Sequence, residues 1–131
     1  MVRVEELIED IESTFSMEDS GIDLRLIYNY SQLNAYGKMI MDKISPGKDG
    51  WRGDLSKKEQ FEKAVKFKER CQKGRGDRYS LLFWALLILA FDDTDKEEHL
   101  SQICALSIFL GINGEEMRNL VRLVYIFCRD K

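Results

Sequence analysis

The stretch that decides the fold is LLFWALLILAFDDTDKEEHL, residues 81–100. It begins with an unbroken apolar run, 81–91, and then turns abruptly acidic. A helix that crosses a bilayer needs about 18–20 apolar residues, whereas the longest apolar stretch, 79–91, is shorter and contains a serine. A helix that is apolar on every side is typical of one buried on nearly every side. We therefore predict that residues 78–91 form a buried central helix and not a membrane span.

Outside this stretch, apolar residues recur at the three- and four-residue spacing of amphipathic helices, and no strand or internal repeat is predicted. The segment SPGKDGWRGD, 45–54, holds the only proline and three glycines, so it is expected to be a loop. Gly37 lies within an expected helix and is predicted to mark a close crossing of two helices. The expected helices span residues 2–16, 22–44, 55–73, 78–91, 95–110 and 114–129. Together they predict a compact all-α bundle of about six helices in a single domain, 1–131.

The composition is that of one folded domain. The chain has 131 residues, of which 44% are hydrophobic and 33% charged, enough for one core under a well-solvated surface. Its net charge of −3 hides a segregation, because residues 1–23 hold eight acidic residues and one basic one, whereas residues 57–78 hold nine basic and four acidic ones. The acidic and basic helices are expected either to neutralise each other or to attract outside partners of opposite charge.

The cysteines and the N-terminus indicate the compartment. Cys71, Cys104 and Cys128 lie far apart in apolar helical contexts. An odd number at wide spacing is not a disulfide framework, so we expect three buried thiols in a reducing compartment. The acidic, amphipathic N-terminus lacks the basic start and apolar core of a secretory signal. We therefore expect a cytoplasmic protein with no membrane span.

Acidic residues crowd the turn after the apolar run: Asp92, Asp93, Asp95 and Glu98. Carboxylate oxygens at this density could bind Ca²⁺ or Mg²⁺. An EF-hand is excluded because, counted from Asp93, Glu98 stands where that loop needs glycine and Cys104 where it needs glutamate. The alternative, which we favour, is that the acids stabilise the start of the next helix, with Thr94 and Glu97 forming a capping box.

The only histidine, His99, has no second histidine or cysteine at ligand spacing. A zinc site or a serine–histidine–aspartate triad would require further partners from elsewhere in the chain. We therefore interpret His99 as a solvated or capping residue.

A basic row is predicted on one face of the helix at 55–73: Lys63, Lys66, Arg70 and Lys73. Such a row could follow the phosphates of a nucleic acid or bind an acidic partner. Three glutamates precede three of these lysines by four residues, in the order Glu59, Glu62 and Glu69. This is the favourable orientation for intrahelical ion pairs, so we favour a solvated face with internal pairs.

A second set of residues has the composition of a partner-binding surface: Trp51, Arg118, Arg122, Tyr125 and Arg129. The last four share one face of the expected helix 114–129, and arginine and tyrosine are enriched at interfaces. The same residue types can also stack on nucleobases. A tryptophan displayed from loop 45–54 would be a candidate hot spot. The alternatives are that this face is only solvated and that Trp51 folds back onto the core.

The half of the chain from Tyr79 onward resembles the TerB-like superfamily, the tellurite-resistance type of helical domain. The resemblance is carried by LLILAFDD, by DKEEHLSQICALSIFLGI and by NGEEMRNLV. The family usually has Asp-Gly in the acidic turn, where this chain has Asp92-Asp93. The resemblance implies an all-α domain of bacterial or phage type with a stress-related or scaffolding role. It also implies a divalent cation at the acidic turn.

Three functions remain open from the sequence. The leading hypothesis is a non-enzymatic protein-interaction or scaffold module of TerB-like type, for which another protein is the expected partner. The alternative is a small nucleic-acid-associated or phage-type inhibitor protein that uses the basic helix faces. The third is a metal-dependent enzyme that uses the acidic turn. The first predicts no cofactor, apart from a Ca²⁺ or Mg²⁺ ion at the acidic turn if the family's site is present.

Overall fold

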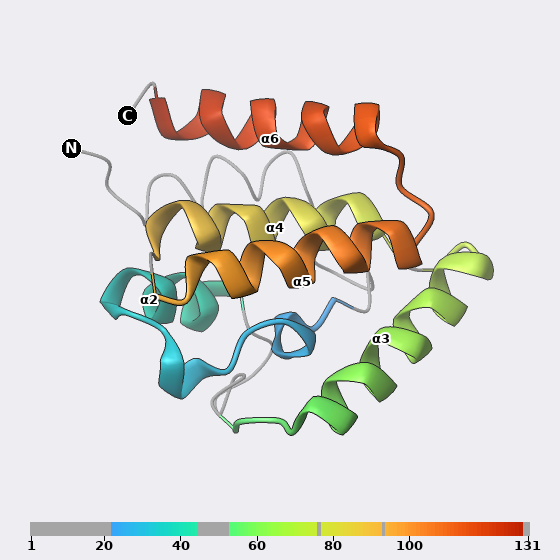
Figure 1. Cartoon of the computed structure of the whole chain (residues 1–131), viewed down its shortest axis with the longest axis horizontal. Helices are drawn as coiled ribbons and strands as arrows, with labels where there is room; N and C mark the ends of the chain where they lie inside the picture. The colour runs from blue at the N-terminus through green and yellow to red at the C-terminus, as the bar shows by residue number, and fades with distance from the viewer. Residues whose placement is uncertain (1–21, 45–52, 76, 93, 130–131) are drawn as a thin grey trace.

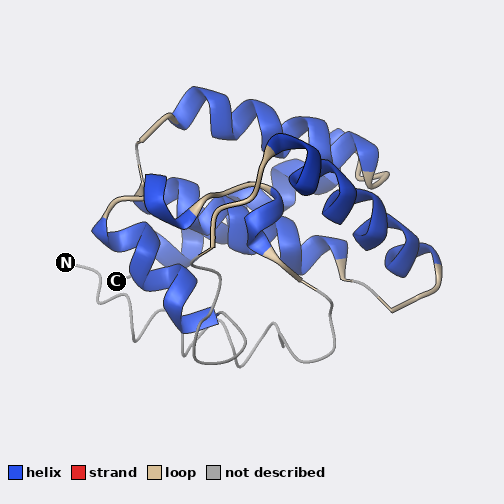
Figure 2. Ribbon diagram, turned by 90° about the horizontal axis from the view of Figure 1, so that it is seen from below, coloured by secondary structure: helices blue, strands red, loops and turns tan. Residues whose placement is uncertain are grey.

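The computed structural model describes residues 22–44, 53–75, 77–92 and 94–129 (Figure 1). Within these ranges every regular element is helical and no strand occurs, as Figure 2 shows from a second direction. The elements are the 3-10 turns η1 (Leu24–Leu26) and η2 (Tyr30–Gln32) and the α-helices α2 (Ala35–Ile44), α3 (Lys57–Gln72), α4 (Arg78–Phe91), α5 (Lys96–Phe109) and α6 (Gly114–Arg129). The all-α class is confirmed for the described residues. The expected helix 2–16 lies outside them, so the total of six stays a prediction.

Helix α4 contacts α2, α5, α6 and η1, and in Figure 1 it lies between α6 above and α2 below. Each of residues 80–89 is buried. The ring of Phe83 packs edge-on against Trp84 and against Phe127 of α6, with centroids 6.1 and 5.7 Å apart. Burial of a large apolar side chain contributes about 1.5–3 kcal/mol relative to exposure. Much of the stability of the described fold therefore comes from α4.

An aspartate borders α4 at each end. The Asp77 carboxylate accepts hydrogen bonds from the Ser80 backbone N–H and hydroxyl, at 3.0 and 2.7 Å, and so caps the first turn. At the other end the N–H of Asp92 donates to the carbonyl of Ile88 at 2.9 Å. The backbone of Asp92 then becomes extended, which ends the helix.

The expectation of one helix over residues 22–44 is wrong, because this segment divides into η1, η2 and α2. Side chains of aspartate and asparagine take over backbone hydrogen bonds along it. Asp23 caps η1, Asn34 Oδ1 accepts from the N–H of Gly37 at 2.8 Å, and Asn29 bonds both the N–H and the carbonyl of Leu55. Such side chains compete with helical bonding, and here they replace a continuous helix with turns.

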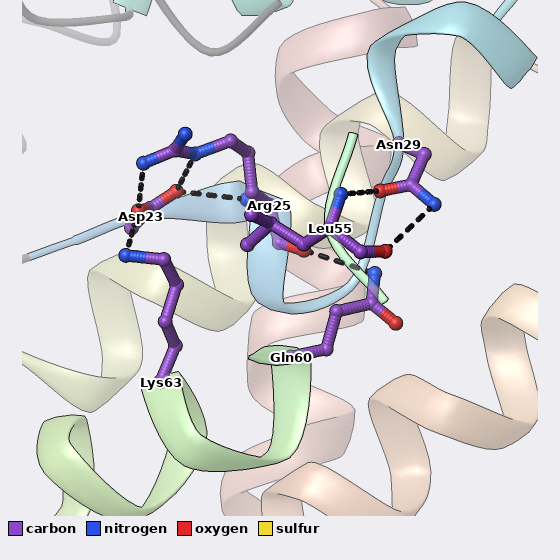
Figure 3. Close-up of polar contacts among 6 residues, drawn as sticks. All are labelled: Asp23, Arg25, Asn29, Leu55, Gln60 and Lys63. Atoms are coloured by element: carbon purple, nitrogen blue, oxygen red, sulfur yellow. Dashed lines mark hydrogen bonds and ion pairs between the residues drawn. The ribbon is translucent and has the colours of Figure 1, made fainter. Parts of the chain in front are cut away.

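Helix α3 begins with a capping box between Ser56 and Glu59 and is followed by Gly74 in a left-handed conformation, φ 72°. Its buried residues are Gln60, Ala64 and Phe67. The spacing of the sequence predicts an apolar stripe through Phe61, Ala64, Val65 and Cys71. It is correct at Ala64, which is buried, and wrong at Phe61, which is 64% exposed, while Val65 and Cys71 are half-buried. Gln60 is buried although it is polar, because its amide donates to the carbonyl of Arg25 in η1 at 3.0 Å (Figure 3).

In the sequence, Gly111 predicts the end of one helix and the Asn113–Glu116 spacing predicts the start of the next, and both caps are confirmed between α5 and α6. Gly111 is left-handed, φ 80°, and the N–H of Ile112 donates to the carbonyl of Ser107 at 2.9 Å. At the start of α6, Asn113 and Glu116 exchange side-chain-to-backbone hydrogen bonds of 2.8 and 3.1 Å. Local sequence signals therefore place this turn correctly.

Candidate functional site

Asp92, the first residue of the acidic turn, is buried, with 2% exposed. Its Oδ2 accepts from the backbone N–H of Asn34 at 2.7 Å, and its Oδ1 accepts from that of Thr94 at 2.8 Å. A Cβ atom on Gly37 would lie 2.7 Å from the same Oδ2, so α2 approaches the end of α4 closely at this glycine. The close crossing expected at Gly37 is therefore present. Oδ2 of Asp92 thus links the end of α4 to the start of α2, while Oδ1 holds the turn that follows α4.

The other expected cation ligands take no part in the hydrogen bonds of Asp92. Asp95 is exposed and left-handed, φ 49°, and Glu98 pairs with Lys57 at 3.1 Å. Asp93 lies outside the described residues. Asp95 occupies the N-cap position of α5 without a side-chain cap bond, so the capping box expected from Thr94 is wrong. No group of three potential metal ligands occurs among the described residues, and Ca²⁺ or Mg²⁺ binding stays a prediction.

His99 is buried, which overturns the expectation of a solvated residue. Its Nδ1 lies 3.1 Å from the carbonyl oxygen of Thr94, and its ring centroid lies 4.7 Å from that of Tyr28. The Tyr28 hydroxyl donates to the carbonyl of Ala85 at 2.7 Å, and burial raises the pKa of this tyrosine strongly. His99 also borders a polar cavity of about 130 Å³ together with Asp95 and Glu98. The structure thus gives His99 a packing role at the start of α5.

The basic row of α3 is only partly free for a ligand (Figure 3). Lys63 lies 3.0 Å from the carboxylate of Asp23, which also binds the guanidinium of Arg25 at 2.9 Å. Burial acts to raise the pKa of Asp23, but the hydrogen bonds from Arg25 and Lys63 outweigh it and hold the pKa below its usual value. Lys66 and Lys73 are exposed. Lys63 therefore ties α3 to η1, while the row's outward members face solvent.

The intrahelical ion pairs expected along α3 are wrong. Within the described residues, none of the three glutamates lies within ion-pair distance of the lysine four residues later. Glu59 instead accepts from the N–H of Ser56 at 3.0 Å in the capping box, and Lys63 pairs with Asp23. Arg70 donates to the carbonyl of Arg75 at 3.4 Å. Capping and tertiary contacts therefore displace the expected pairs.

The predicted partner-binding face of α6 is exposed. Arg118 and Arg122 are exposed, and Tyr125 has 63% of its surface open to solvent. Arg129 belongs to α6, but its side chain is outside the described part of the structure, as is all of Trp51. The structure thus brings three of the five expected partner-binding residues together on one helix face.

The outer face of α5 was not predicted as a functional surface. Ile103 and Leu106 are buried beneath the helix, whereas Leu100 and Ile108 on its outer sides are 43% and 77% exposed. Cys104 also lies on the outer side, so the expectation of three buried thiols is wrong for this cysteine. Cys71 and Cys128 are half-buried, which raises the pKa of both thiols. An apolar helix face therefore remains uncovered in the described part of the chain.

Two apolar grooves flank this face. The first, the α3 groove, has a volume of about 390 Å³ between η1, α3 and α5, and it is lined by Leu26, Ile27, Lys57, Gln60, Phe61, Ala64, Gln102, Ala105, Leu106 and Phe109. The second, the α6 groove, has a volume of about 290 Å³ between α4, α5 and α6, and it is lined by Leu86, Leu89, Ala90, Lys96, Leu100, Val121, Val124, Tyr125 and Cys128. Each lining set includes a single charged residue, and in both it is a lysine. The ammonium group of Lys68 lies 4.4 Å above the ring of Phe109, at the edge of the α3 groove.

None of the described helices has the length and apolar character needed to cross a membrane. The region that resembles the TerB-like superfamily contains α4, α5 and α6. Comparison with known proteins found no matching family model, no matching curated protein and no matching solved structure. The TerB-like resemblance therefore stays a prediction of the sequence.

Proposed function

We propose that the protein is a non-enzymatic protein-interaction module that binds a partner across the outer face of α5 and the adjoining face of α6. One observation carries this proposal: α5 has apolar residues on all its sides, and within the described part of the chain Leu100 and Ile108 are left exposed. Ile108 and Leu100 are exposed to solvent, and Leu100 also lines the α6 groove. Exposed apolar surface beside a groove is typical of interaction sites.

The residue types beside the exposed face support the same function. Tyr125 and Val121 of α6 line the α6 groove, and Arg122 lies on the exposed side of the same helix. Tyrosine and arginine are the residue types most often found to dominate binding at interfaces. More specifically, we propose a scaffold or stress-related role of the TerB-like type.

A second candidate function is nucleic-acid binding. It is supported by Lys66 and Lys73, which are both exposed on one face of α3. It ranks lower because Lys63, a further member of the row, is held by Asp23. Metal-dependent catalysis has less support again, since both oxygens of Asp92 already bind backbone N–H groups.

The proposal is tested by affinity capture from an extract of the native cells, with the wild-type chain and with Ile108→Asp as bait. Because Ile108 is exposed, the variant should keep its melting temperature, and it should lose the one dominant protein that the wild-type bait recovers. Tyr36→Asp provides the control, since Tyr36 is exposed on α2 and lines neither groove. Recovery of the same proteins by the wild-type and Ile108→Asp baits would contradict the proposal.

A further inference from the structure

We infer that the α6 groove binds an acidic amphipathic helix of a partner protein. The inference rests on the proposed function and adds the chemistry of the partner to it. It follows from the shape of the groove, from the charges along it and from the residues exposed at its rim.

The shape fits a helix. The floor of the groove is formed by Leu86 and Leu89 of α4, one wall by Leu100 of α5 and the other by Val121 and Tyr125 of α6. In Figure 1, α5 lies in front of α4 and α6 lies above it, and a short turn joins α5 and α6 at one end. A groove between two such helices can accept the apolar stripe of a third helix. Its volume of about 290 Å³ suits a few large apolar side chains.

The apolar residues at the rim of the groove are partly exposed, so a bound helix could cover them. Leu100, Val121 and Tyr125 are 43%, 49% and 63% exposed, so a bound helix would cover apolar surface on both walls. A helix presents such anchors to a groove at intervals of three or four residues. The core residues Leu86 and Leu89 lie beneath them and are already buried. Binding would therefore add apolar burial at the rim without opening the core.

The charges select an acidic occupant. Lys96 is the one charged residue that lines the groove, no acidic residue lines it, and Arg122 is exposed on the α6 side. Glutamates on the flanks of a bound helix would face these cations, whereas lysines would be repelled. If a second copy of this chain bound face to face on α6, its Arg122 and Lys96 would approach the same two cations of the first copy. This repulsion of like charges would cost free energy. The groove is therefore suited to an acidic partner helix more than to self-association.

The test uses two labelled peptides and the full chain. Each peptide has about 18 residues of alanine and leucine, with leucines at helical spacing, and its remaining positions are all glutamate in one peptide and all lysine in the other. Fluorescence anisotropy at low salt should show that the glutamate peptide binds at least about tenfold more tightly than the lysine peptide. Lys96→Glu should reduce or reverse that preference. Equal binding of the two peptides would overturn the inference.

Two variants of α6 show whether the groove is the site. Val121→Asp places a charge in the groove wall and should reduce binding of the glutamate peptide by at least about tenfold. Ile126→Asp is the matched control, because Ile126 is on the same helix and is 47% exposed but does not line the groove. Circular dichroism and melting temperature should be the same for both variants. Unchanged peptide binding by Val121→Asp would overturn the inference.

Two further outcomes separate the inference from the proposed function. Analytical ultracentrifugation that shows a dimer of the free chain, dissociated by Val121→Asp, would identify a second copy as the occupant and overturn the acidic partner. If the native extract yields a partner that is lost with Ile108→Asp while the glutamate peptide fails to bind the wild-type chain, the interaction function stands and the acidic-helix inference falls.

Discussion

Helices α4 and α5 are neighbours of equal length, 14 residues each, and both carry apolar residues on every side. In α4 the contacts with α2, α5, α6 and η1 cover all of residues 80–89. In α5 the same kind of surface is left open at Leu100 and Ile108. An apolar helix surface that its own chain does not cover is available to another molecule. The comparison therefore separates apolar residues that build the core from those that stay exposed to solvent.

The largest expected effect is a contrast in stability between these two helices. Leu87 of α4 is fully buried and lines neither groove, so Leu87→Ala should lower the free energy of unfolding by about 2–5 kcal/mol. Ile108→Ala in α5 should change it by less than about 0.5 kcal/mol, because the side chain is exposed. Urea unfolding with a shared m-value measures both. A loss of 2 kcal/mol or more in Ile108→Ala would show that Ile108 belongs to the core.

A smaller effect is expected where the core helix joins α2. Gly37→Ala should destabilise the fold by about 1–3 kcal/mol, because its new Cβ would meet the carboxylate of Asp92 at 2.7 Å. Asp92→Ala should cost about 1–3 kcal/mol by leaving the N–H groups of Asn34 and Thr94 without their acceptor. The double variant should cost less than the sum, since the clash then disappears. Strict additivity in urea unfolding would show that Gly37 and Asp92 are not coupled.

The sequence predicts the fold best where the signals are local. The apolar run predicted a helix over residues 78–91, and α4 has these bounds. Gly111 and Asn113 marked the turn between α5 and α6 because a left-handed glycine and a capping asparagine act within a few residues. The segment 22–44 was mispredicted because Asn29 finds its hydrogen-bond partner at Leu55, 26 positions away. A pattern of apolar residues contains no information about such a partner.

The candidate site could be predicted only in part for the same reason. Arg118, Arg122 and Tyr125 of α6 were predicted from spacing on one helix, and the structure places these three together on an exposed face. The grooves beside α5 were missed, although the signal for them, a helix with no continuous polar side, is present in residues 100–109. In α4 a helix without a continuous polar side is buried over residues 80–89. The sides of α5 that are covered depend on its tertiary contacts, chiefly those with α4, which the sequence does not contain.

The smallest expected effect concerns α3, which is held to η1 by polar contacts as well as by apolar packing. Because the pKa of Asp23 is lowered in the folded state, its bonds stabilise the fold above the unfolded-state pKa of about 3.9, and this stabilisation is lost as the pH falls through the lower folded value. Asp23→Asn should therefore be less stable than wild type by about 1 kcal/mol at pH 7. The difference should shrink as the pH falls below about 4.

Urea unfolding of both proteins at several pH values between about 7 and 3 measures this difference. Glu62→Gln is the matched control. Glu62 is exposed on α3, so its substitution should change the free energy of unfolding by less than about 0.5 kcal/mol at every pH. A gap between wild type and Asp23→Asn that stays constant down to pH 3 would mean that the carboxylate charge does not hold α3. In that case α3 would be attached by apolar packing and by neutral hydrogen bonds such as that of Gln60 to Arg25.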